Sequence, residues 1–249
     1  MTIPETAFIH HPELKDLIRD PEQSFFRDLN LDEVDARMAE RGVPMPWRRT
    51  DEDREANRRT FLEGHQGPVW IFAYGSLMWD PAILFDEVRH ARIVGYSRSM
   101  CLVDRRGARG SAEAPGLMAG LAPGGTCDGL VFRIPEELVE QETERLWRRE
   151  MIAHAYYPDF AQAETAVGQV RALCFVADPA ADMIDTALSH EQQVTYISRG
   201  EGFLGTSLEY LENMLAQFEA MKVDDPALQA LLRDVQRERA AGQGGRSGT

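Results

Sequence analysis

Strand-length apolar runs in the middle of the chain most constrain its fold. The first, VWIFAY at residues 69–74, is continuously apolar and stops at Gly75, as a buried strand does. Comparable runs follow at residues 90–96, 99–104, 117–122, 128–134 and 170–177. Helical patterns occur at about 135–152 and at 206–221. The first of them begins at a proline, which is a common first residue of a helix. Because strands cluster first and helices dominate the last third, we expect an α+β domain whose mixed sheet closes into a small barrel flanked by helices.

The segment before residue 69 differs in composition from the rest of the chain. It is rich in charged residues and proline and poor in β-branched residues. Its stretch at 29–42 predicts a short helix that ends at Gly42, and the charged run at 46–61 predicts a solvated surface. We therefore expect a partly helical N-terminal extension at 1–68, a folded domain at 69–238 and a tail at 239–249 that is disordered by composition.

Charge and composition exclude several classes of protein. The chain has 249 residues, 43% of them hydrophobic, which suffices for a sizeable core. A net charge of −14 argues against nucleic-acid or anionic-membrane partners. No stretch approaches the ~20 apolar residues of a membrane span, and the start does not resemble a secretory signal. The 3 cysteines are far apart and favour neither a disulfide framework nor a zinc site. We expect a cytoplasmic protein without a metal.

The end of the first strand is a candidate binding site. A strand that runs directly into Tyr74-Gly75-Ser76-Leu77 presents consecutive backbone N–H groups that can cradle a carboxylate or an oxyanion. Gly75 allows close backbone approach, and Ser76 adds a hydroxyl. The alternative is a plain strand-ending turn, which is common.

Glu150 is a candidate general base. On the helix that begins near Pro135, it shares a face with Leu146 and Trp147 at helical spacing. Desolvation on an apolar face raises the pKa of a carboxylate and makes it a competent base near neutral pH. The alternative is an ordinary helical glutamate that pairs with Arg145, Arg148 or Arg149.

Two glycine-rich segments are further candidates. The loop at 105–116 contains Arg105, Arg106 and Arg109, which could close over a ligand carboxylate, although the sequence favours a mobile, solvated loop for any single arginine. The segment at 200–205 matches a dinucleotide fingerprint, but the residues before it are polar and helical in pattern. Too little chain follows it for a doubly wound half-domain, so we reject that interpretation.

Four sequence blocks together resemble the ChaC family of γ-glutamylcyclotransferases. They are IFAYGSLMW (71–79), RG…APG (109–116), LWRREMIAHAYYP (146–158) and GFLGTSLEYL (202–211). The resemblance covers about residues 68–235 and keeps the order of the family. It implies a small mixed barrel flanked by helices and a reaction that needs neither a metal nor an organic cofactor. That reaction cuts the γ-glutamyl bond of glutathione and releases 5-oxoproline and Cys-Gly.

The resemblance also implies roles for particular residues. In the family the strand-turn binds the γ-glutamyl group, which here implies Ile71, Phe72, Ala73, Tyr74, Gly75, Ser76 and Leu77. The glutamate of the RE pair is the proton acceptor, which implies Glu150, and Tyr156 matches a tyrosine that follows it.

Two alternatives stay open within this resemblance. Ala73 stands where the family usually has glycine, and Leu117 stands where well-known members have arginine. Both departures would favour a cyclotransferase for other γ-glutamyl amines or amino acids. The second alternative is a non-catalytic regulatory protein that binds a γ-glutamyl ligand. The retained Glu150 argues against it, because an inward carboxylate costs stability unless it has a use.

Overall fold

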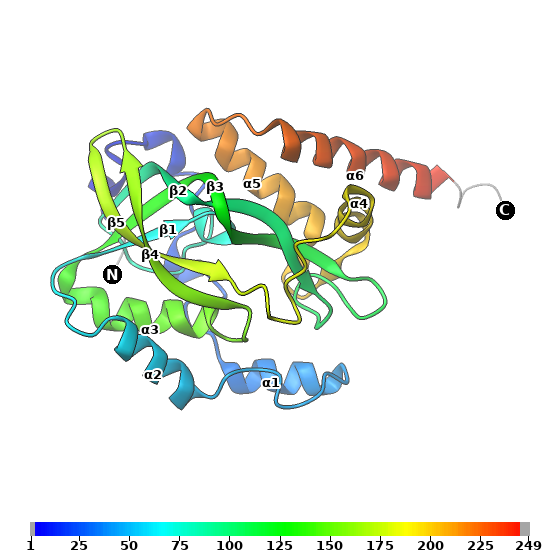
Figure 1. Cartoon of the computed structure of the whole chain (residues 1–249), viewed down its shortest axis with the longest axis horizontal. Coiled ribbons are helices and arrows are strands. Elements are labelled where there is room, and N and C mark those ends of the chain that lie inside the picture. The colour runs from blue at the N-terminus through cyan, green and yellow to red at the C-terminus, as the bar shows by residue number, and fades with distance from the viewer. Residues whose placement is uncertain (1–2, 245–249) are drawn as a thin grey trace. The chain divides into compact units, whose positions relative to one another are not determined.

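The fold is built on a closed barrel of five strands, seen in the computed structural model, which describes residues 3–244 (Figure 1). The strands are β1 (Val69–Ala73), β2 (Glu87–Asp104), β3 (Gly116–Ile134), β4 (Tyr156–Thr165) and β5 (Gly168–Ala177). Their order around the barrel is β1-β3-β2-β4-β5. β1 pairs antiparallel with β3 and parallel with β5, which closes the barrel. The predicted mixed barrel is therefore confirmed.

The described chain divides into two compact units. The first comprises residues 3–98 and 121–181, and the second comprises 99–120 and 182–244. In the first unit, fully buried side chains such as Phe72, Ile93 and Val131 form a core cluster from the strands. Their burial is the main favourable contribution to folding.

The strands differ from the predicted ones in two respects. Runs 90–96 and 99–104 form the single strand β2, and runs 117–122 and 128–134 form the single strand β3. The sequence did not predict β4, because YYPDFAQAET contains no continuous apolar run and only alternate residues near its end are buried. Pairing with β5 along its whole length defines this strand instead.

Helices and turns of the first unit connect and cover these strands. They are η1 (Glu5–Phe8), η2 (Pro12–Leu14), η3 (Pro21–Gln23), α1 (Leu31–Glu40), α2 (Asp51–Phe61), η4 (Ser76–Met78), η5 (Glu136–Leu138) and α3 (Val139–Glu150). The Asn30 side chain caps α1, and Gly42 follows its end with a φ of 73°, so the predicted helix and its stop are confirmed.

The charged run at 46–61 is solvated on one face, as expected, but its other face is buried. It contains α2, which packs along α3 (Figure 1). Arg54 and Arg58 are buried there, and Nη1 of Arg58 donates to Oγ1 of Thr143 at 3.0 Å. Arginines at this helical spacing bury their stems against a neighbouring helix while carboxylates satisfy the guanidinium groups.

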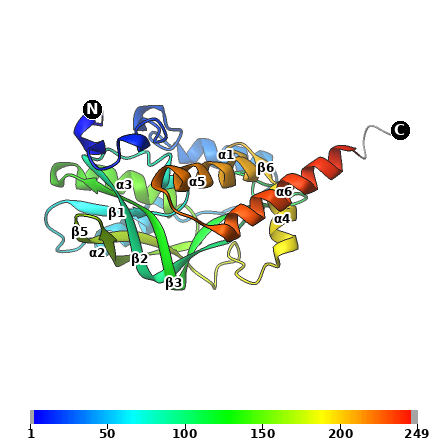
Figure 2. The ribbon, with the colours of Figure 1, turned by 90° about the horizontal axis from the view of Figure 1, so that it is seen from above.

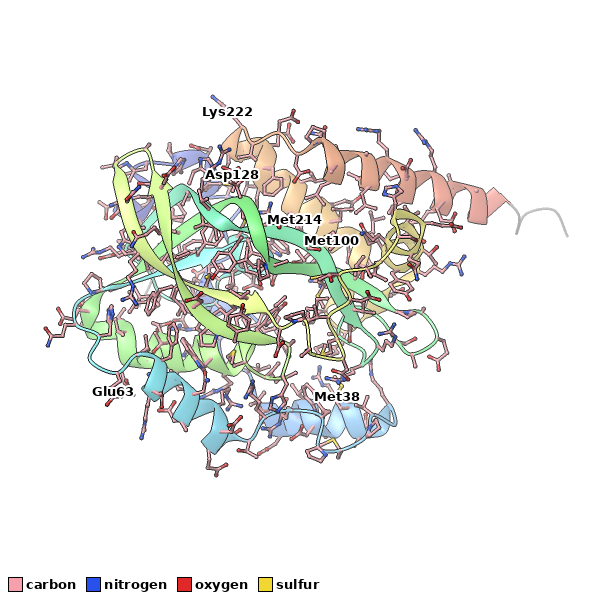
Figure 3. The ribbon with its side chains drawn as sticks, in the orientation of Figure 1. Met38, Glu63, Met100, Asp128, Met214 and Lys222 are labelled. Atoms are coloured by element: carbon pink, nitrogen blue, oxygen red, sulfur yellow. The ribbon has the colours of Figure 1, made fainter. Side chains whose placement is uncertain are left out.

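The second unit contains most of the C-terminal helices. Its elements are α4 (His190–Arg199), β6 (Glu201–Gly202), β7 (Gly205–Thr206), α5 (Ser207–Met221) and α6 (Pro226–Gly244). Figure 2 shows α5 beside α6, and the two helices are in contact. Met214 is fully buried on α5, whereas Lys222 ends that helix in the left-handed conformation and points outward (Figure 3).

The predicted tail needs one correction. α6 continues to Gly244, whereas we expected disorder from residue 239 onward. Strong helix formers such as Glu238, Arg239 and Ala240 explain the longer helix. Residues 245–249 lie outside the part that the structure describes. Among residues 3–244, no helix is both long and apolar enough to cross a membrane.

Candidate active site

The predicted turn begins where β1 ends. Ile71, Phe72 and Ala73 are fully buried, backbone included, so no part of these three residues is open to a ligand in this structure. Tyr74 is buried too, and its hydroxyl donates to the carbonyl of Phe175 on β5 at 2.8 Å. The turn therefore offers backbone groups and few side chains to a ligand.

Hydrogen bonds within the turn fix the next residues. The N–H groups of Met78 and Asp80 donate to the carbonyls of Gly75 and Ser76 at 2.8 and 2.9 Å. The first N–H groups of a helical turn have no partner within it. In the described part of the chain, no group accepts a hydrogen bond from the N–H of Ser76 or Leu77. The Leu77 side chain is buried, so this residue also contributes through its backbone.

Helix α3 presents its apolar face to the barrel, as the sequence spacing predicts. Leu146 and Trp147 are each 1% exposed, and the Trp147 ring packs edge-on against Phe175 at 5.1 Å between centroids. Glu150 is the last residue of this helix, and its side chain is 14% exposed. Burial raises the pKa of Glu150, while the charge of Arg149 and its hydrogen bond act in the opposite direction.

Arg149 connects this carboxylate to the turn. Its Nε lies 2.9 Å from Oε1 of Glu150, and its Nη2 donates to Oγ of Ser76 at 2.9 Å. Its Nη1 donates to the carbonyl of Asp80. The sequence indicates Arg149 only as one alternative partner of Glu150. Its contact with Ser76 joins segments far apart in the chain, and no local pattern signals it.

Tyr156 lies at the same edge of the barrel as the turn. It is the first residue of β4 and pairs with Ala177, the last residue of β5. Because β1 and β5 are parallel, both end at this edge, where the turn at Gly75 follows β1. The Tyr156 side chain is half-buried. The structure thus brings the turn, Glu150 and the start of β4 into one region of the first unit.

The most buried carboxylate of α3 is a residue that sequence reasoning did not select. Glu142 is fully buried and accepts hydrogen bonds from the Leu84 N–H at 3.0 Å and from Arg145 at 2.9 Å. It also pairs with Arg27 from the N-terminal extension. These partners satisfy its charge, so Glu142 serves to hold the structure together.

The other two sequence blocks meet in the second unit. Arg109, from the loop that the sequence offered as a ligand clamp, donates to the Thr206 carbonyl at 2.9 Å. A Cβ atom added to Gly200 would lie 2.5 Å from Cα of Gly116 and 2.8 Å from Oγ of Ser207. Close backbone packing therefore explains Gly116 and also Gly200, which belongs to the rejected dinucleotide fingerprint.

Metal ligation finds no support among residues 3–244, where no group of three or more His, Cys, Asp or Glu side chains is placed to hold an ion. The cysteines Cys101, Cys127 and Cys174 are buried, and no disulfide joins them.

The barrel and its helices define a γ-glutamyl cyclotransferase-like fold. A solved structure of a γ-glutamyl cyclotransferase specific to glutathione from yeast aligns with a TM-score of 0.64 at 18% identity, covering 70% of this chain and 98% of its own. The family described as ChaC-like protein matches residues 69–238, and the chain therefore belongs to that family.

Curated relatives carry one recurring name. The glutathione-specific gamma-glutamylcyclotransferase of Escherichia coli (strain K12) is 38% identical over 173 residues, which cover 69% of this chain and 74% of the relative. Glutathione-specific gamma-glutamylcyclotransferase 1 of Homo sapiens is 30% identical over 158 residues, which cover 60% of this chain and 69% of the relative.

Proposed function

We propose that this protein is a γ-glutamylcyclotransferase that cleaves glutathione to 5-oxoproline and Cys-Gly, with Glu150 as the general base. The observation that carries the proposal is the link from Glu150 through Arg149 to Ser76, which places a largely buried carboxylate beside the turn. Membership of the ChaC-like family and the names of the relatives in Escherichia coli and Homo sapiens support the substrate.

The reaction suits a site of this kind because the substrate supplies its own nucleophile. The α-amine of the γ-glutamyl group attacks the γ-carbonyl carbon and closes a five-membered lactam. The bond between that carbon and the cysteine nitrogen then breaks, which releases Cys-Gly. Correct orientation can lower the barrier of such an intramolecular attack by about 7–11 kcal/mol.

Glu150 handles the proton in this scheme. An unperturbed α-ammonium has a pKa near ~8, so most of the amine is protonated at neutral pH and cannot attack. The Glu150 carboxylate takes this proton, and the ring nitrogen loses a second one after it has attacked. Both protons end on the departing cysteine nitrogen, which leaves as an ammonium group, so the step balances without another reactant. Its raised pKa makes it a stronger base than an ordinary glutamate.

In this proposal the turn stabilises the negative charge that develops on the γ-carbonyl oxygen. The N–H groups of Ser76 and Leu77 are the donors in this proposal, since no group in the described part of the chain engages them otherwise. Preorganised donors of this type stabilise an oxyanion more than they stabilise a neutral carbonyl. Tyr156 contributes to the substrate pocket from the start of β4.

The second candidate is a cyclotransferase for other γ-glutamyl amines or amino acids. Ala73 and Leu117 motivate it, but both side chains are fully buried and neither is available to contact the leaving group. The third candidate is a binding protein without turnover.

One experiment separates these functions. Purified protein is incubated with glutathione, a γ-glutamyl amino acid or a γ-glutamyl amine, and 5-oxoproline is followed by mass spectrometry. We expect product mainly from glutathione. Product only from the other substrates would establish the second candidate. Saturable binding of glutathione without product from any substrate would establish the third.

A further inference from the structure

The N-terminal extension contacts both segments that carry the proposed site. This extension lies outside residues 69–238, which match the ChaC-like family. The Arg19 N–H donates to the Trp79 carbonyl at 2.8 Å, and Nη1 of Arg19 donates to Asp80 at 3.0 Å. Trp79 and Asp80 directly follow the turn that contains Ser76. Segment 19–27 therefore reaches the chain next to the proposed oxyanion donors.

Local hydrogen bonds give this segment a defined shape. The Asp20 side chain accepts from the Glu22 N–H at 3.0 Å and caps η3, which begins with Pro21. The Ser24 hydroxyl, which is buried, then accepts from the Phe26 N–H at 3.1 Å. These two turns set the direction of Phe26 and of Arg27 after it.

Arg27 anchors the far end of the segment on α3. Its side chain is 6% exposed, pairs with the fully buried Glu142 and donates to the Ala82 carbonyl at 3.3 Å. Each partner of this buried ion pair restricts the position of Arg27. The pair therefore also fixes where Phe26, the residue before it, lies.

Phe26 covers the guanidinium that links the base to the turn. The Cζ atom of Arg149 lies 4.0 Å from the centroid of the Phe26 ring. The three nitrogens of the same guanidinium contact Glu150, Ser76 and the Asp80 carbonyl. In-plane hydrogen bonds fix the position of a guanidinium, and an aromatic face beside it limits its motion out of that plane.

We propose that segment 19–27 is a positioning element for the active site, in which Phe26 holds Arg149 so that Arg149 orients Glu150 and Ser76. This inference rests on the proposed function for its catalytic consequence. The extension is then part of the working enzyme, and the family-matched region alone has a less ordered site. Phe26 touches no reacting atom, so its effect passes through Arg149.

The first test replaces Phe26 by side chains that should leave the fold intact and that either keep or lack an aromatic ring. We expect Phe26→Leu, which keeps an apolar side chain but removes the aromatic face, to lower kcat/KM by roughly three- to thirtyfold, the range that corresponds to a cation–π contact. Phe26→Tyr keeps the face and should restore most of the activity. Phe8→Leu is the matched control, because Phe8 also belongs to the extension and packs edge-on against Phe85 at 5.8 Å. Equal losses in Phe26→Leu and Phe26→Tyr, or in Phe8→Leu, would overturn the proposal.

A double-mutant cycle tests whether Phe26 acts through Arg149. In the background of Arg149→Gln, Phe26→Leu should cause little further loss of kcat/KM, since the group that the ring holds is gone. Independent, multiplicative losses would contradict the proposal.

A measurement without substrate separates this proposal from the proposed function. Amide hydrogen exchange of the peptide covering residues 74–80 should be faster in Phe26→Leu than in the wild type and unchanged in Phe8→Leu. If the wild type turns over no γ-glutamyl compound, the proposed function fails while the exchange still reports on the positioning element. If the wild type is active and this peptide exchanges equally in all variants, the positioning role fails alone.

Discussion

The Nη2 of Arg149 lies 2.9 Å from Oγ of Ser76, and this contact ties helix α3 to the turn after β1. The same guanidinium holds Glu150 through its Nε. A side chain that is 4% exposed therefore connects the proposed base with the proposed oxyanion donors. Preorganisation of this kind lets both groups act without rearranging during the reaction.

Replacing the proposed base tests its role directly. We expect Glu150→Gln to lower kcat for 5-oxoproline release by about 10²–10⁴-fold, because the amide cannot accept the proton of the α-ammonium. Binding of glutathione, measured by calorimetry, should persist. Glu144→Gln is the control, since Glu144 lies on the same helix and pairs with Arg148. Full turnover by Glu150→Gln would move the base to another group.

The acid limb of the pH profile reports the environment of Glu150. Burial raises the pKa of Glu150 above its ordinary value of 4.5, against the opposing effect of Arg149. The reaction needs the unprotonated form, so kcat/KM should fall as the pH drops through this raised pKa. Arg149→Gln removes the opposing charge and should move the limb to higher pH. A limb at or below pH 4.5 in the wild type would contradict the assignment, provided that thermal melts show the protein to be folded there.

The sequence predicts those parts of the site that have a local signal. The apolar run before Gly75 and the helical face shared by Leu146, Trp147 and Glu150 each lie within a single element, and the structure has both. The resemblance to the ChaC family is what indicates that the turn at Gly75 and Glu150 belong to one site. The mixed barrel also follows, because the apolar strands determine most of its sheet.

The remaining features depend on contacts between distant segments. Strand β4 has no apolar run and is defined by its pairing with β5. The contacts of Arg149 with Ser76 and of Arg27 with Glu142 span 73 and 115 positions in the chain. Periodicity within one element cannot show which distant partner a charged side chain meets. For the same reason the charged run at 46–61 does not reveal that one face of its helix, α2, packs on α3.

The buried charge of Glu142 makes a prediction about stability. Glu142→Ala leaves Arg27 buried without its carboxylate and should lower the free energy of unfolding by about 3–5 kcal/mol, measured by urea denaturation. Glu144→Ala removes a partly exposed pair on the same helix and should cost about 0.3–0.5 kcal/mol. The double variant Arg27→Leu/Glu142→Leu should recover part of the loss, because it also removes the deeply buried Arg27 charge and leaves only the more exposed Arg145 without Glu142. Similar losses for Glu142→Ala and Glu144→Ala would show that the buried pair is not structural.

Two glycine substitutions in the second unit should act in opposite directions. At Gly200 an added Cβ would lie 2.5 Å from Cα of Gly116, which is backbone and cannot swing away. Gly200→Ala should therefore lower the free energy of unfolding by about 1–3 kcal/mol, as overpacking does. At Gly242, on helix α6, an added Cβ meets nothing within 4 Å, so Gly242→Ala should raise stability by up to about 1 kcal/mol through helix propensity. Thermal or urea denaturation measures both, and a Gly200→Ala protein as stable as the wild type would show that the close approach to Gly116 relaxes without cost.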